Sequence, residues 1–174
     1  MSETSLTQKQ KQLLTDLQSK NETIITEALK AVPEDGSPEM MPYLVSLWTS
    51  NPNQEIAHLL EKVLFNLKDV KVIPVLLNML KSELFAKDRA SIMNVIWQSG
   101  LDVSEETVLF TNIAIAGDYM TAFEALTIID NQEELPEEQI HESIRMLDKA
   151  INKKSDIQAL LGNLRQIFLE KLLG

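Results

Sequence analysis

Residues 73–100 read IPVLLNMLKSELFAKDRASIMNVIWQSG and contain two apolar runs separated by a polar, charged segment. The second run, at 92–97, has apolar residues at the spacing of one helical face. It is followed by Gly100, and glycine commonly ends helices. The first run, IPVLLNML at 73–80, aligns with MPYLVSLW at 41–48 with an offset of 32 residues. The sequence therefore predicts a repeating unit that consists of two helices.

An apolar stripe recurs along the chain at a similar period. Four segments align with offsets of 31, 33 and 30 residues. They are Ala28, Leu29 and Val32; Leu59, Leu60 and Val63; Ile92, Met93 and Ile96; and Ala122, Phe123 and Leu126. One helix pair cannot bury its apolar stripes alone, whereas stacked pairs share a continuous core. We therefore expect a stack of helix pairs in which these residues are buried.

Helix-favouring residues and evenly spread breakers predict about ten helices of roughly 10 to 16 residues, joined by short connections. The clearest helix is expected at about 53–68, with Asn51-Pro52 at its start because asparagine caps helices and proline suits the first turn. Ser19 and Glu22 have the spacing of a capping box at the start of another helix.

The quoted stretch resembles a HEAT repeat, which belongs to the wider armadillo-like group of α-solenoids. Pro74 sits where this family commonly has a proline in its first helix, and Asp88-Arg89-Ala90 is similar to the opening of its second helix. The resemblance covers 37–172. The units near 105–130 and 139–172 lack both the proline and the arginine at these places.

This resemblance implies an all-α fold, a right-handed α-solenoid of about five stacked antiparallel helix pairs with a period of about 32 residues. We expect a single domain over residues 1–174. Stacks of this kind usually present a surface that binds another macromolecule, and the pattern carries no active site. The implied function is a non-enzymatic protein- or peptide-binding scaffold module that uses the concave face of the stack.

The composition and charge exclude several classes of protein. The 174 residues are 44% hydrophobic and have a net charge of −10, and no Lys or Arg lies between Ala90 and Ile144. Because phosphate binding needs clustered cations, we expect no nucleic-acid partner, and an anionic membrane surface would repel the chain. The sequence has no Cys, its first twenty residues lack the apolar run expected of a signal peptide, and no apolar run reaches about 18 residues. We therefore expect a soluble, cytoplasmic protein.

Both histidines lie in Glu-x-x-His strings, at 55–58 and 138–141. Such strings occur in di-metal carboxylate bundles, so an enzyme or accessory factor with an acidic, metal-binding site is the alternative function. Helical phase disfavours it, because His58 and Glu138 point away from the apolar stripes whereas metal ligands must face the core. The sequence has no Gly-rich phosphate loop and no Gly-x-Ser-x-Gly motif. We therefore assign no catalytic, cofactor-binding or metal-binding residue.

Eleven carboxylates lie between Asp102 and Glu142. Many fall at expected turns and helix starts, where capping and the helix dipole explain them. In a functional interpretation they form a docking surface for a basic partner segment. Trp48 and Trp97 lie near the expected core and are interpreted as packing residues.

The resemblance implies that the second helix of each pair lines the concave side of the stack. The predicted partner surface therefore lies on these helices, on the side opposite the apolar stripe. Phe65 and Ile128 would be its apolar anchors, because they occupy faces that should be polar. Glu61 and Glu124 would attract a basic segment. The complete set is His58, Glu61, Phe65, Asn94, Gln98, Glu124 and Ile128.

Overall fold

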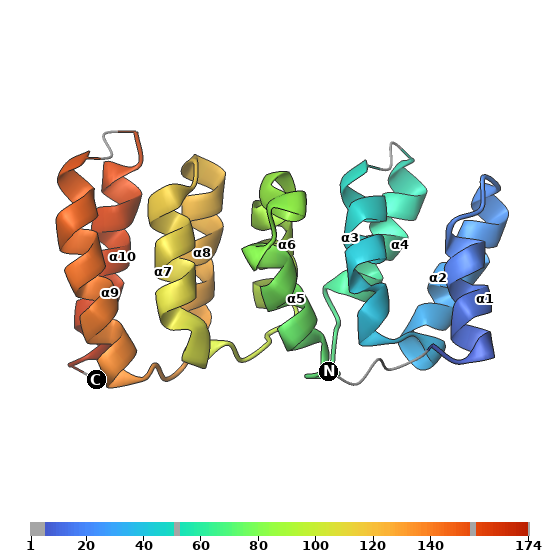
Figure 1. Cartoon of the computed structure of the whole chain (residues 1–174), viewed down its shortest axis with the longest axis horizontal. Helices are drawn as coiled ribbons and strands as arrows, with labels where there is room; N and C mark the ends of the chain where they lie inside the picture. The colour runs from blue at the N-terminus through green and yellow to red at the C-terminus, as the bar shows by residue number, and fades with distance from the viewer. Residues whose placement is uncertain (1–5, 51–52, 154–155, 174) are drawn as a thin grey trace. The chain divides into compact units, whose positions relative to one another are not determined.

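The computed structural model describes residues 6–50, 53–153 and 156–173 (Figure 1). Most of these residues are helical, and no strand occurs among them. The all-α fold predicted from the sequence is confirmed. The chain divides into two compact units, Met1–Val95 and Ile96–Gly174, and the division falls within α6 (Arg89–Gln98). The predicted single domain therefore contains two units.

The described helices of the first unit lie side by side, and consecutive helices run antiparallel (Figure 1). Its helices before α6 are α1 (Gln8–Leu17), α2 (Glu22–Asp35), η1 (Pro38–Met40), α3 (Met41–Ser50), α4 (Gln54–Leu64), α5 (Val72–Lys81) and η2 (Glu83–Asp88). α1 packs on α2, and α3 packs on α4. α2 also contacts α4, and α3 also contacts α5. Each helix pair thus covers the apolar side of its neighbour in the chain.

The second unit repeats this scheme. Its helices after α6 are η3 (Ser104–Glu106), α7 (Thr107–Ala116), α8 (Tyr119–Asn131), α9 (Glu137–Ala150), η4 (Ile151–Lys153) and α10 (Gln158–Lys171). α7 pairs with α8, and α9 pairs with α10. α7 contacts α9 and α8 contacts α10, so the odd-numbered and even-numbered helices form two layers.

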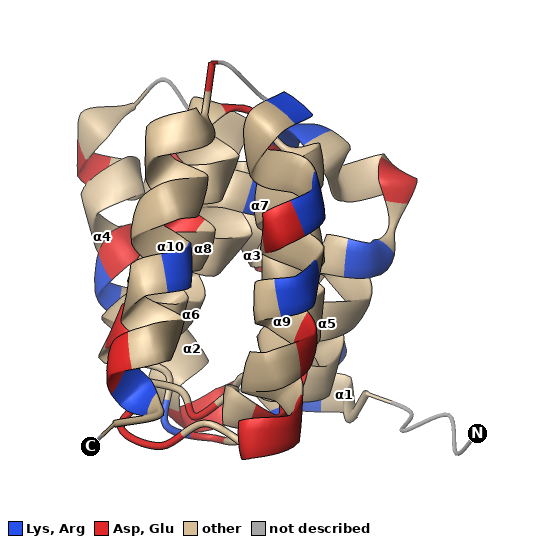
Figure 2. Cartoon of the chain, turned by 90° about the vertical axis from the view of Figure 1, so that its left-hand side faces the viewer, with Lys and Arg blue, Asp and Glu red and all other residues tan. Residues whose placement is uncertain are grey.

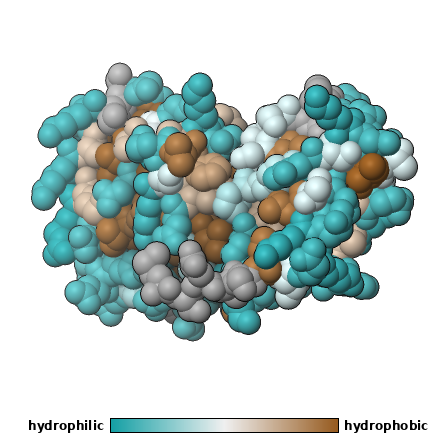
Figure 3. All heavy atoms as spheres, turned by 45° about the vertical axis from the view of Figure 1, so that its right-hand side comes forward, coloured by the Kyte–Doolittle hydropathy of each residue, from teal (hydrophilic) through white to brown (hydrophobic). Residues whose placement is uncertain are grey.

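The predicted apolar stripes are largely buried in the first unit. Leu29, Leu60 and Ile92 are almost fully buried, as the self-alignment predicted. On the face shown in Figure 3, hydrophilic side chains cover much of the surface and apolar side chains are visible between them. Burial of these apolar side chains is the main source of stability for helices of this length, because they are marginal in isolation.

The structure confirms one predicted helix end and corrects one predicted helix start. Gly100 ends α6 as expected: its φ is +62°, and the N–H of Leu101 donates to the carbonyl of Ile96 over 3.2 Å, as in a Schellman motif. α2 begins after Asn21, whose side chain caps it, so the predicted capping box of Ser19 and Glu22 is wrong.

The start of the helix predicted at 53–68 also differs. The side chain of Asn53 caps α4 by accepting from the N–H groups of Glu55 and Ile56. Asn51-Pro52 lies outside the described residues. α4 ends at Leu64, four residues earlier than predicted.

The predicted apolar stripe of α8 is wrong in phase. Phe123, which the alignment placed in the core, is exposed, whereas Ile128, expected on the opposite face, is fully buried. The buried apolar residues of α8 are Ala122, Ala125, Ile128 and Ile129. The two alanines on this face let α8 pack closely, and the larger Phe123 remains outside the core.

Candidate partner-binding surface

Three large apolar side chains are exposed in the first turns of α8. Tyr119, Met120 and Phe123 are 56%, 52% and 42% exposed. We call these three residues the α8 apolar row. Aromatic and methionine side chains exposed together on one element are unusual for a surface that stays in contact with water. α8 therefore presents an apolar face that has no partner within the described chain.

The helix that carries this row is fixed at both ends. At its start, the side chain of Asp118 caps the helix and accepts from the N–H of Thr121 over 2.9 Å. Hydrogen bonds from the backbone and side chain of Thr121 lower the pKa of the Asp118 carboxyl. At its end, Lys171 Nζ donates to the carbonyls of Asp130 and Gln132 over 3.3 and 2.5 Å. The row therefore lies on a helix that is capped at its start and hydrogen-bonded to α10 at its end.

The buried carboxylate of Glu124 links α8 to Trp97, near the end of α6. Trp97 Nε1 donates to Glu124 Oε2 over 2.7 Å, and Glu124 is only 7% exposed. This bond fixes the orientation of the indole ring, because the N–H must point toward the carboxylate. Glu124 is therefore a structural group of the second unit.

Trp97 also forms part of the wall of a surface pocket of about 470 Å³. The other lining residues are Gly100, Leu101, Asp102, Ser104, Asn131, Gln132, Glu133 and Glu134. We call this the Trp97 pocket. Among these described residues there are three carboxylates and no Lys or Arg, so the pocket is negatively charged.

The buried side chain of Gln132 shapes the Trp97 pocket. Its Oε1 accepts from the N–H of Val103 over 2.9 Å, and its Nε2 donates to the carbonyl of Leu101 over 3.4 Å. Asp102 in turn accepts from the N–H and the hydroxyl of Ser104, and these bonds lower the pKa of its carboxyl. The loop is thus held from inside, with an ionised Asp102 at its surface.

Acidic residues also occupy the first turn of the next helix, α9. Figure 2 shows Asp and Glu in the first turn of α9 and Lys and Arg further along it. The first-turn residues are Glu137 and Glu138, where the helix dipole favours negative charge. His141 Nε2 lies 3.4 Å from Glu137 Oε1, and both side chains are exposed.

In the first unit, two of the predicted surface residues are polar and lie on α4, and a third packs against another side chain of the same unit. His58 is exposed, and its Nδ1 lies 3.5 Å from Glu61 Oε2. Phe65 is half-buried, and its ring packs at 90° against the ring of Trp48, with 5.4 Å between centroids. Asn94 is half-buried in α6. Phe65 thus covers Trp48, which explains an apolar residue at this position.

The predicted surface residues of the second unit are less well placed. Gln98 is exposed, but Glu124 and Ile128 are buried, so the expectation that these two face a partner is wrong. The phase of α8 explains both errors, because the core-facing side begins at Ala122 and continues through Ile128. Sequence reasoning missed Tyr119 and Met120. The Asp118 cap marks where the helix begins, and two alanines mark its close-packed side.

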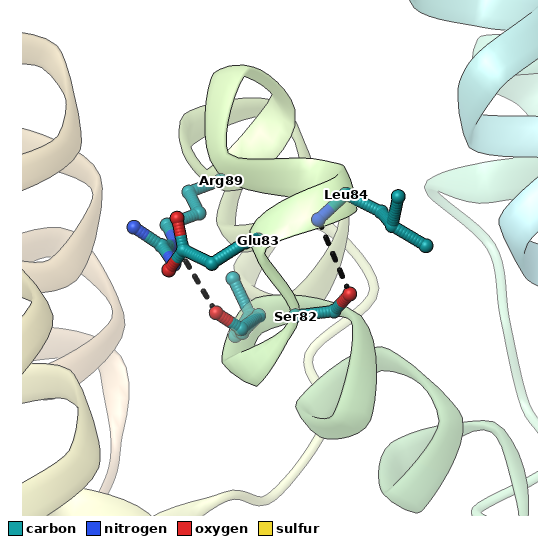
Figure 4. Close-up of polar contacts among 5 residues, drawn as sticks. Ser82, Glu83, Leu84 and Arg89 are labelled. Carbon is teal, nitrogen blue, oxygen red and sulfur yellow. Dashed lines mark hydrogen bonds and ion pairs between the residues drawn. The ribbon is translucent and has the colours of Figure 1, made fainter.

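Leu84 in the first unit is a further exposed apolar residue, at 89%. Its N–H donates to Ser82 Oγ over 3.3 Å, while Arg89 bonds Glu83 over 2.8 Å and the carbonyl of Leu80 over 3.1 Å. In Figure 4, Leu84 points away from the Glu83 and Arg89 side chains. A single exposed leucine on a well-ordered turn is a smaller apolar feature than the α8 apolar row.

The described residues contain no group of three or more His, Cys, Asp or Glu side chains placed to hold a metal ion. His58 and His141 each approach one glutamate on the helix surface. Within the same described ranges, no helix has both the length and the apolar character needed to cross a membrane.

No protein-family model, curated protein or solved structure matches the chain. Its surface chemistry is therefore the basis for a functional proposal.

Proposed function

We propose that this chain is a non-enzymatic protein-binding module and that the α8 apolar row receives the partner. The observation that carries the proposal is the exposure of Tyr119, Met120 and Phe123 on one helix. Aromatic side chains dominate the energetics of protein interfaces, and methionine adapts to varied apolar surfaces. A partner that covers the row would remove its apolar surface from water, which contributes a favourable free energy of about 25 cal/mol per Å² buried.

The proposal includes a HEAT-like solenoid architecture for the repeated helix pairs. Two observations support it within each unit. Consecutive helices pair, and helices two positions apart in the chain also contact each other, as α2 with α4 and α7 with α9. In α-solenoids each repeat contacts its neighbours in this way and leaves one layer of helices free for binding. α8 belongs to the even-numbered layer, the second helices of the pairs.

Part of the surface predicted from the sequence remains in the proposal. Gln98 is exposed in the second unit, and His58 and Glu61 are accessible on α4 in the first. We retain Gln98 as a candidate contact of the second unit, and we consider His58 and Glu61 only as a separate candidate patch within the first unit. Glu124 and Ile128 are replaced by Phe123 and Met120 as the contributions of α8, because only the latter two are exposed.

The metal-dependent alternative lacks support from side-chain geometry. Each histidine faces a single glutamate on an exposed helix surface, whereas a di-metal centre needs ligands that converge from several helices. Metal analysis of the purified protein tests this alternative directly. Stoichiometric iron or manganese would favour it over a binding module.

Affinity capture with matched variants tests the binding function. The baits are the wild-type protein, Tyr119→Ser/Phe123→Ser, and Leu84→Ser, which removes an exposed apolar side chain elsewhere. Circular dichroism first verifies that all three are equally folded. We expect a partner that the wild type and Leu84→Ser retain and that the double variant retains at least tenfold less.

Photo-crosslinking then locates the contact on the chain. The crosslinking residue p-benzoylphenylalanine replaces Met120 in one protein and Leu84 in another. We expect the captured partner to crosslink at position 120 and not at position 84. A partner retained equally by all baits, or crosslinked only at position 84, would contradict the proposed surface.

A further inference from the structure

The α8 apolar row and the Trp97 pocket lie along one helix face. On α8, Met120, Thr127 and Asn131 are separated by seven and four residues and point in nearly the same direction, with Phe123 beside this line. Asn131 lines the Trp97 pocket. One partner segment that follows α8 therefore meets both the row and the pocket.

We propose that this segment carries an apolar residue for the α8 apolar row and an arginine for the Trp97 pocket. The inference rests on the proposed function and adds the chemistry of the partner. Phe123 and Asn131 are eight residues apart, which is about 12 Å along a helix axis. An extended peptide rises about 3.3 Å per residue, so the apolar residue and the arginine are separated by about four residues.

The lining of the pocket selects a cation. Asp102, Glu133 and Glu134 supply negative charge, and the pocket has no lining Lys or Arg among the described residues. The Lys171 ammonium group donates to the carbonyls of Asp130 and Gln132 and adds one positive charge beside the pocket, which the three lining carboxylates outnumber. The chain between Ala90 and Ile144, which includes α8 and every residue that lines the pocket, contributes no Lys or Arg. A basic segment would therefore be attracted before contact.

Trp97 favours arginine over lysine in this pocket. Its ring is held in one orientation by the bond to Glu124. A planar guanidinium stacks on an aromatic face and bonds carboxylates with two parallel N–H groups, whereas an ammonium group is compact and strongly hydrated. The pocket combines an aromatic wall with carboxylates, which together match the guanidinium group.

A random 12-residue peptide library displayed on phage tests the inference without a known partner. Peptides are selected on the full-length wild-type protein and counter-selected on Phe123→Ser. Enriched peptides are synthesised with a fluorophore, and their affinities are measured by fluorescence anisotropy at low and high salt. We expect an apolar residue and an arginine about four positions apart. Replacing that arginine by glutamate should weaken binding more than tenfold, and replacing it by lysine should weaken binding less.

Matched protein variants separate the two parts of the site. Asp102→Asn/Glu133→Gln/Glu134→Gln keeps the shapes of the three side chains, and we expect it to weaken binding about tenfold and reduce the salt dependence. Leu84→Ser should bind like the wild type. In nuclear magnetic resonance spectra, the indole N–H signal of Trp97 should shift on binding while that of Trp48 remains as an internal reference.

The outcomes distinguish the inference from the proposed function. If the enriched peptides depend on Phe123 but show no preference for arginine, or bind the triple variant normally, the inference is overturned and the proposed function stands. If no peptide depends on Phe123, the proposed function fails, and the inference fails with it.

Discussion

Trp97 donates a 2.7 Å hydrogen bond from its indole N–H to Glu124, a carboxylate that is almost completely buried in the second unit. The sequence places these residues 27 positions apart, in different helices. The bond connects the end of α6 to the middle of α8. It assigns Glu124 to the internal structure of the unit, and it also orients the ring that forms part of the Trp97 pocket.

Removal of the Glu124 carboxylate should destabilise the protein. Glu124→Ala deletes the acceptor of the Trp97 N–H, and a buried donor without its acceptor costs about 1–3 kcal/mol. Glu124→Gln keeps an oxygen that can accept this bond and should cost less. Urea unfolding followed by tryptophan fluorescence measures both free energies. Equal losses for the two variants would show that the hydrogen bond to Trp97 is not what Glu124 contributes.

Two substitutions on α8 test the observed orientation of this helix. Ile128→Ala removes fully buried side-chain atoms and should lower the free energy of unfolding by about 2–4 kcal/mol. Phe123→Ala truncates an exposed side chain and should change it by less than about 1 kcal/mol. Both substitutions introduce alanine, which has a high helix propensity. The difference in unfolding free energy between the two variants therefore reflects mainly the loss of packing. Thermal or urea unfolding measures it, and the opposite order would restore the orientation predicted from the sequence.

Local chemistry predicted several parts of the fold correctly. Gly100 ends α6 because its positive φ suits glycine, and this depends only on neighbouring residues. Neighbouring residues with similar capping ability were harder to separate. Ser19 and Asn21 can both cap a helix, and the structure uses Asn21. The residue whose side chain accepts a hydrogen bond from the first turn becomes the cap, and the spacing of residues in the sequence does not reveal which one this is.

The candidate surface was less predictable because α8 has two overlapping apolar stripes. Ala122, Phe123 and Leu126 fit one face, and Ala122, Ala125 and Ile129 fit another. Contacts with α7 and α10 select the second, where the small alanines fit closely. Such selection depends on helices elsewhere in the unit. The Trp97 pocket likewise depends on residues from two separate segments, at 97–104 and 131–134.

The Asp118 cap should make stability depend on pH in the acidic range. Its pKa is lowered in the folded protein by the hydrogen bonds from Thr121. A lowered pKa means that the carboxylate stabilises the fold above the ordinary aspartate pKa of about 3.9. This contribution is lost as the pH falls through the folded pKa. Relative to Asp118→Asn, which caps without titrating, the wild type should therefore lose stability between about pH 4 and pH 2.

Urea unfolding at several pH values measures this difference. Asp118→Ala serves as a control, because it removes the cap at every pH and should cost about 1 kcal/mol near neutral pH. A constant difference between the wild type and Asp118→Asn from pH 7 to pH 2 would contradict the role given to the charged cap.

Two glycines should respond in opposite directions to the same substitution. Gly100 has a φ of +62°, and a Cβ atom built there meets no atom within 4 Å. The cost of Gly100→Ala is therefore backbone strain alone, about 1 kcal/mol, because L-residues disfavour this conformation. Gly162 lies within α10, and a Cβ there also meets nothing within 4 Å. Gly162→Ala should stabilise the protein by about 0.5–1 kcal/mol, since alanine favours the helix and restricts the unfolded chain.

Thermal unfolding compares each variant with the wild type, and Gly100→Asn gives a further check because asparagine tolerates positive φ better than alanine. Gly100→Asn should lose less than Gly100→Ala. A loss for Gly162→Ala would mean that the surroundings of α10 resist the added methyl group, and no loss for Gly100→Ala would mean that the end of α6 adopts another turn in solution.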